Sequence, residues 1–166
     1  MSDPFEPHGS LLRHFADLRD RSHGGATTRR GKEIAFERGV ELLAPVVREV
    51  LITFDDHLLL GGGEIEDLAI RRDPQGGLVA GWILTWDQQR RSGVAAVQVI
   101  AHYGAGFHHP HLRGGTIAEW PLNVADGEQA RGQRALVEAI VAAEFHNLVF
   151  LADYRIVPAT VAVAAS

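Results

Sequence analysis

Apolar residues, most of them large Leu or Trp side chains, occupy every second position from Leu78 to Trp86, and this alternation constrains the fold more than any other feature of the chain. Successive side chains of a strand point to opposite faces, so the pattern predicts a strand with one well-buried face. Ile65–Ile70 and Val94–Ile100 also predict strands, and Asp73–Gly77 has the composition of a turn. The polar segment Gln88–Gly93 predicts a loop. Three successive strands without intervening helices indicate an antiparallel meander.

Helical spacing of apolar residues precedes this meander. Leu11–Leu18 predicts a helix that Ser10 can cap, and residues 28–43 predict a second helix with Pro45 near its end or at a kink. The following residues, 46–60, are compatible with either a strand or a helix.

A second helical pattern follows the meander. Trp120–Leu122 is too short and too interrupted by proline for a core strand, whereas Asp126 can cap a long helix over residues 127–147. Val149–Leu151 suits a short strand, and Pro158 begins a loose tail. The order predicts an α+β fold with N-terminal helices, an antiparallel β-meander, an active-site loop and a long C-terminal helix.

The composition limits the class of protein. A chain of 166 residues predicts one domain over residues 1–166, with residues 1–31 as an N-terminal helical extension. With 46% apolar and 22% charged residues, the chain has the composition of a soluble globular protein. A net charge of −5, with mixed signs, argues against nucleic acid as a partner. No run approaches the roughly 18 apolar residues that span a bilayer, so no membrane partner is expected.

The chain contains no cysteine, which excludes disulfides and cysteine-bound metals. The N-terminal residues lack the features of a secretion signal. We therefore expect a cytoplasmic protein without a cofactor.

Histidines gather in one segment of the chain. His102, His108, His109 and His111 are four of the nine histidines, and the fold can bring His57 or His146 close to them. Imidazoles bind zinc, nickel or copper, so a metal site is one interpretation of this cluster. No recognised metal-binding motif is present, and a histidine is often a hydrogen-bonded structural residue. Metal binding therefore remains the weaker alternative.

The order of a meander, the sequence His109-Pro110-His111, a small residue at Ala118 and a long helix resembles ubiquitin-conjugating enzymes. The resemblance covers roughly residues 32–147. That family has a His-Pro-Asn loop followed eight residues later by the cysteine that carries the thioester. Here His111 stands at the asparagine position and Ala118 stands at the cysteine position, seven residues on.

The resemblance implies a protein that accepts a ubiquitin-like protein from an activating enzyme as a thioester at position 118 and passes it to an amine. Ala118 cannot form that bond, because a methyl group is neither a nucleophile nor a leaving group. Either an engineered change or natural divergence accounts for it. By the same resemblance, His111 donates a hydrogen bond to the oxyanion or braces the loop, and His109 holds the loop through backbone hydrogen bonds.

The resemblance also implies partners. The basic residues Arg29, Arg30 and Lys32 mark the expected face for the activating enzyme. An arginine-rich chain of this kind suggests a bacterial member from a ubiquitin-like conjugation operon. The alternative on the same fold is a noncatalytic binding module that scaffolds a partner.

Overall fold

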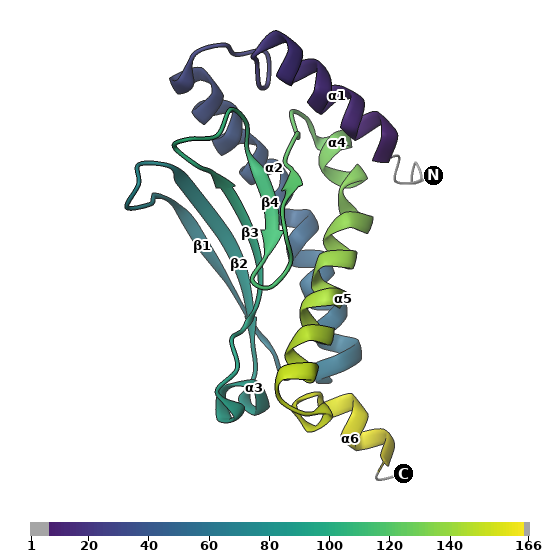
Figure 1. Cartoon of the computed structure of the whole chain (residues 1–166). Helices are drawn as coiled ribbons and strands as arrows, with labels where there is room; N and C mark the ends of the chain where they lie inside the picture. Colours follow the sequence, from purple (N-terminus) through teal and green to yellow (C-terminus); the bar gives the residue numbers. More distant parts are fainter. Residues whose placement is uncertain (1–6, 165–166) are drawn as a thin grey trace.

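A computed structural model of the protein describes residues 7–164, which form an α+β fold with one antiparallel sheet (Figure 1). The five strands follow one another in space in chain order, so the sheet is a meander. They are β1 (Glu64–Arg72), β2 (Leu78–Thr85), β3 (Val97–Tyr103), β4 (His111–Gly114) and β5 (Trp120–Pro121). The predicted meander is confirmed, and it is two strands longer than expected.

The alternation in β2 positions this strand in the centre of the core. Leu78, Ala80, Trp82 and Leu84 are all buried. Strand β2 pairs with β1 on one side and with β3 on the other, and Trp82 lies opposite Val99 of β3. Burial of these apolar side chains supplies the main driving force for assembling the sheet.

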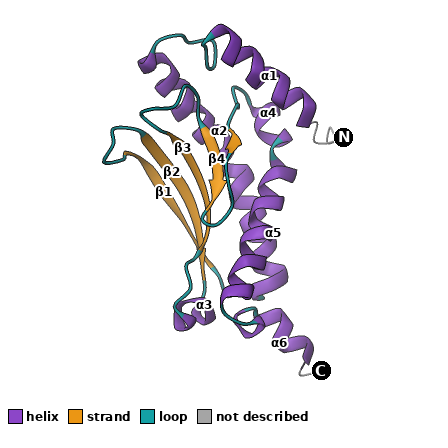
Figure 2. Ribbon diagram, in the orientation of Figure 1, coloured by secondary structure: helices purple, strands orange, loops and turns teal. Residues whose placement is uncertain are grey.

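Two long helices pack against each other and against the sheet (Figure 2). Helix α2 (Arg29–Phe54) begins at Thr28, whose side chain accepts a hydrogen bond from the Gly31 amide. The helix runs past Pro45, and a π-helical turn follows it at Asp55–Leu59. The prediction that it ends near residue 43 was therefore wrong.

The reason for this difference is tertiary packing. Val46, Val47, Val50 and Leu51 continue the buried face of α2 beyond the proline. Their burial outweighs the hydrogen bond that Pro45 cannot donate, and it resolves the ambiguity of residues 46–60 in favour of a helix.

The helices after the sheet also differ from the sequence-based expectation. Asp126 caps α4 (Gly127–Gly132) as predicted, because its carboxylate accepts a hydrogen bond from the Gln129 amide. The helix is interrupted at Gln133, and a second helix, α5, extends from Arg134 to Leu151. The strand predicted at residues 149–151 is thus the last turn of α5.

Shorter helices occupy three further segments. Helix α1 (Pro7–Asp20) starts before Ser10, which is buried within it and does not cap it. Helix α3 (Asp87–Ser92) replaces the loop predicted after β2, and α6 (Pro158–Ala164) replaces the loose tail. No helix of the described residues is long and apolar enough to cross a membrane.

Stacked aromatic rings join the layers of the molecule. The Phe145 ring of α5 stacks on Phe54 of α2 at 5.7 Å and on Trp86, after β2, at 5.3 Å between centroids. The Trp86 indole donates a 2.6 Å hydrogen bond to the carbonyl of Ile156. This cluster fixes the end of the sheet against both long helices.

Candidate functional site

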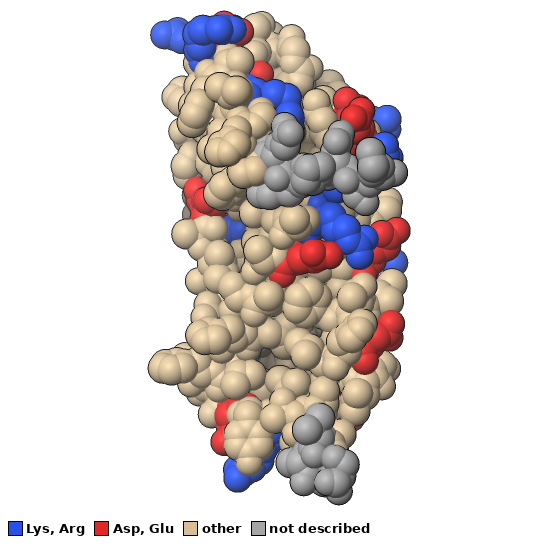
Figure 3. Space-filling model, turned by 90° about the vertical axis from the view of Figure 1, so that its right-hand side faces the viewer, with Lys and Arg blue, Asp and Glu red and all other residues tan. Residues whose placement is uncertain are grey.

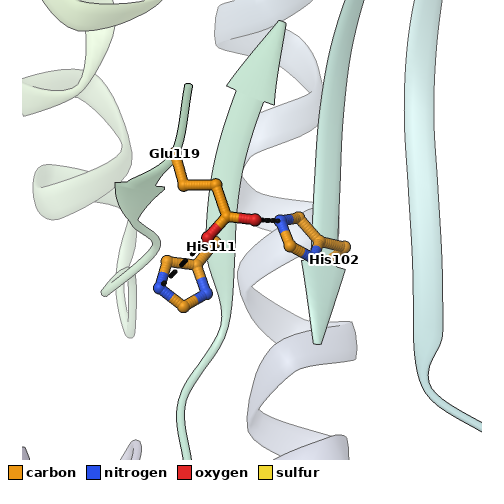
Figure 4. Close-up of side chains that lie close together, drawn as sticks. All are labelled: His102, His111 and Glu119. Atoms are coloured by element: carbon orange, nitrogen blue, oxygen red, sulfur yellow. Dashed lines mark ion pairs between the residues drawn. The ribbon is translucent and has the colours of Figure 1, made fainter. Parts of the chain in front are cut away.

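Two histidines face each other across neighbouring strands. His102 on β3 is the register partner of His111 on β4, so both side chains lie on the same face of the sheet. Glu119, from the loop between β4 and β5, extends its carboxylate between the two rings (Figure 4). Its Oε1 lies 3.2 Å from Nε2 of His102, and its Oε2 lies 3.9 Å from Nε2 of His111. We call these three residues the His-Glu cluster.

The two imidazoles of the cluster are largely removed from water. Their side chains are 14% and 13% exposed, whereas the Glu119 side chain is 39% exposed. Burial lowers the pKa of His102, although the Glu119 carboxylate opposes the shift, and burial lowers the pKa of His111 in the same way. Both rings are therefore neutral at neutral pH, with nitrogens able to accept a proton or bind a ligand.

Hydrogen bonding within the cluster is incomplete. Nε2 of His102 and Nδ1 of His111 are buried, and neither has a hydrogen-bond partner among residues 7–164. The 3.2 Å separation between His102 and Glu119 is thus a close ion-pair distance without hydrogen-bond geometry. Buried polar atoms in proteins are normally paired, so these nitrogens are available for an external group.

His109 lies beside this cluster and contacts a residue that the sequence did not indicate. Its ring packs on His14 of α1 at 4.1 Å and on His111 at 4.5 Å between centroids. Burial, together with the neighbouring His14 and His111, lowers the pKa of His109 to about 4. Within the part of the chain that the structure describes, its Nδ1 has no hydrogen-bond partner. His109 therefore contacts its surroundings through ring packing. The expected backbone hydrogen bond is not made by Nδ1 within the described residues.

Arg29 holds the loop that leads from β3 to His109. Its guanidinium donates hydrogen bonds to the carbonyls of Tyr103, Gly104 and Phe107, and it lies 3.6 Å from the centre of the Tyr103 ring. These contacts are internal, although 37% of the side chain of Arg29, a residue of the expected docking face, stays exposed.

The other two residues of that expected docking face differ in exposure. Lys32 is only 8% exposed. Arg30 is exposed but forms ion pairs with Glu33 and Glu37 of its own helix. A docking face made of all three residues does not fit the burial of Lys32, whereas contact of Arg29 and Arg30 with an activating enzyme stays a prediction.

Glu144 of α5 fixes the start of the loop that carries Glu119. Its fully buried carboxylate accepts hydrogen bonds of 2.7 Å from both the amide and the hydroxyl of Thr116. Asn147 donates a further hydrogen bond to the Thr116 hydroxyl. The long helix thus determines the path of the chain towards position 118.

The predicted site residues come together in part. Ala118 is exposed in the β4–β5 loop, directly before Glu119, while His111 begins β4. His108 is exposed and does not join the His-Glu cluster. His57 bonds to the carbonyl of Thr53 in its own helical turn. His146 is exposed on α5, beside Asn147.

Glu119 and His14 are the functional candidates that sequence reasoning missed. The proximity of Glu119 to the histidine segment was a usable signal, whereas nothing in the local sequence links His14 to that segment.

On the described part of the face seen in Figure 3, acidic and basic side chains are interspersed, without a continuous basic surface.

The chain matches no protein-family model, no curated protein and no solved structure.

Proposed function

We propose that this chain is a ubiquitin-conjugating-enzyme-like protein whose reaction position is residue 118. The observation that carries the proposal is the position of Ala118, which is exposed in a loop that follows the meander and directly precedes Glu119 of the His-Glu cluster. A covalent carrier needs an accessible nucleophile close to groups that can accept its proton. Two neutral imidazoles and a carboxylate are such groups.

The reaction requires a cysteine at position 118. Its thiolate attacks the C-terminal thioester of a ubiquitin-like protein and releases the thiol of the activating enzyme. An acceptor amine then attacks the new thioester, an amide bond forms, and the thiol is regenerated. In this step His111 is the proposed donor to the oxyanion, with His109 as a positioning residue.

With alanine at position 118, the chain lacks the nucleophile that this reaction requires. The absence of cysteine favours a second proposal, a noncatalytic module that binds a ubiquitin-like protein or its activating enzyme. The two proposals differ in one property: only the first requires that restoring the thiol restores transfer.

The experiment is to introduce Ala118→Cys and incubate it with ATP, a ubiquitin-like protein from the same genome and its activating enzyme. We expect an adduct that a reducing agent cleaves. Ala142→Cys is the matched control, since Ala142 is an exposed alanine on α5, and it should form no such adduct. If Ala118→Cys forms no adduct although the chain still binds the ubiquitin-like protein, the noncatalytic module stands and the transferase proposal fails.

A further inference from the structure

We propose that His102, His111 and Glu119 form a binding site for a divalent transition-metal ion, for which Zn²⁺ is the best match. One nitrogen from each imidazole and one carboxylate oxygen lie within 4.8 Å of one another. Two histidines and one glutamate are a ligand set that proteins use for zinc in sites that retain an open coordination position. The site shares its three side chains with the proposed conjugation function, but zinc binding requires neither a thiol nor a partner protein and can be tested separately.

The distances suit a small ion. A tetrahedral zinc ion with bonds of about 2.0–2.1 Å places its ligand atoms about 3.3 Å apart. The separation between Nε2 of His102 and Oε1 of Glu119 is 3.2 Å, and that between Nε2 of His111 and Oε2 is 3.9 Å. These separations are to the two oxygens of one carboxylate, and all three ligand atoms lie within 4.8 Å of one another, close to the spacing that zinc requires.

The Nε2 atom of His102, unpaired among the described residues, is a second observation in favour of a bound ion. A buried polar atom without a partner is costly, and Nε2 of His102 is such an atom although a carboxylate oxygen lies beside it. A metal ion between the two groups satisfies the imidazole lone pair and neutralises the carboxylate. An ion pair alone leaves the nitrogen without a hydrogen bond.

The scaffold is suited to hold an ion. His102 and His111 are fixed by strand pairing, and metal sites built on strands retain their geometry better than sites on loops. Phe107 packs edge-on against both rings, at centroid distances of 6.1 Å and 5.1 Å, and covers part of the site. Glu119 supplies the third ligand from the β4–β5 loop, and its side chain is 39% exposed.

The three proposed ligands differ from the four histidines that the sequence suggested as a metal site. That interpretation grouped four histidines of one segment, including His108 and His109. His108 is exposed and outside the cluster, and His109 packs on His14. The fold instead selects two histidines that face each other across strands, and it adds a carboxylate.

Isothermal titration of ZnCl₂ into the untagged, chelator-treated chain tests the proposal. We expect one ion per chain, a rise in the unfolding temperature with zinc, and an affinity about 100-fold or more lower in His111→Gln and in Glu119→Gln. The matched controls His108→Gln and His146→Gln change exposed histidines and should bind zinc like the unmodified chain. Circular dichroism without metal verifies that each variant is folded.

Two results would overturn the proposal. One is the absence of saturable zinc binding by the unmodified chain. The other is binding that His111→Gln and Glu119→Gln leave unchanged, which would assign the ion to other histidines. Loss of binding in either variant, with unfolding in the absence of metal unaltered, supports the site. None of these outcomes depends on transfer by Ala118→Cys, so the two proposals can fail separately.

Discussion

At the scale of single residues, Glu33 is a buried acid held by arginines from two parts of the chain. Its side chain is 6% exposed. It accepts two hydrogen bonds from Arg72, the last residue of β1, and a third from Arg29. The hydrogen bonds from Arg72, with those from Arg29, lower the pKa of Glu33 to about 2, although burial opposes the shift. Glu33 therefore stays ionised in the folded protein well below its usual range.

This lowered pKa predicts a pH dependence of stability. The folded pKa is depressed, so the stabilisation is present above the ordinary pKa of 4.5 and is lost as the pH falls from there towards about 2. Glu33→Gln should lower the free energy of unfolding at pH 7 by about 2 kcal/mol. It should also flatten the pH dependence between these two values, as measured by urea unfolding.

The control for this prediction is Glu37→Gln, which removes a more exposed acid on the same helix, one ion-paired with Arg30. Its effect should stay below about 1 kcal/mol at pH 7. Equal pH profiles for Glu33→Gln and the unmodified chain would contradict the assigned role of Arg72.

Sequence reasoning at this scale singled out His111 and Ala118, and it did not point to Glu119 or His14. The histidines stand out because they are rare and adjacent, so a pattern within one segment finds them. His14 reaches His109 only because α1 folds back onto the β3–β4 loop, and no local pattern encodes that contact. A pairing between residues nearly a hundred positions apart is a property of the tertiary structure.

At the scale of elements, the end of β4 meets α5 with almost no space between them. A Cβ atom added at Gly114 would lie 2.8 Å from the carboxyl carbon of Glu144, which is fully buried. The same carboxylate accepts both hydrogen bonds from Thr116. Glycine at position 114 thus permits the contact that directs the β4–β5 loop.

Gly114→Ala should therefore lower the free energy of unfolding by about 1–3 kcal/mol, because the buried Glu144 side chain has to move. Amide hydrogen exchange at Thr116 should accelerate as its bond to Glu144 is lost. Gly132→Ala is the control: among the described residues, no atom outside its chain neighbours and its own helix backbone lies within 4 Å of the added Cβ. Alanine is also favoured over glycine in a helix. If Gly114→Ala leaves both the free energy of unfolding and the exchange at Thr116 unchanged, the contact with α5 does not constrain this loop.

Element boundaries were predicted well where the signal was local and poorly where packing decided. Asp126 caps α4 as predicted, and the predicted start of a helix at residue 28 agrees with the cap that Thr28 forms on α2, whereas the predicted cap Ser10 lies inside α1. The passage of α2 through Pro45 depends on burial against the sheet and α5. Helix α3 forms in a segment with no apolar periodicity, where Gln89 accepts a hydrogen bond from Trp86 and donates one to Val94.

At the scale of the whole molecule, the meander and the helices form two layers that share one core. The sheet order was predictable because short turns leave consecutive strands few alternatives to antiparallel pairing. The path of α5 across the same layer as α2 was not predictable, since both helices carry apolar faces that could pack on several surfaces. The aromatic contacts of Phe145 determine which arrangement forms at the end of the sheet.

Phe145 therefore provides a test of whether the layers unfold as one unit. Its ring is 4% exposed and lies between Phe54 and Trp86, so Phe145→Ala should lower the free energy of unfolding by about 3–5 kcal/mol. Phe150→Ala removes the same ring from an 84% exposed position of the same helix and should change it by no more than about 0.5 kcal/mol. Urea unfolding followed by tryptophan fluorescence and by far-ultraviolet circular dichroism should give coincident transitions in both variants. Separate transitions in Phe145→Ala would mean that α5 and the sheet unfold independently, and the single shared core would then be the wrong description.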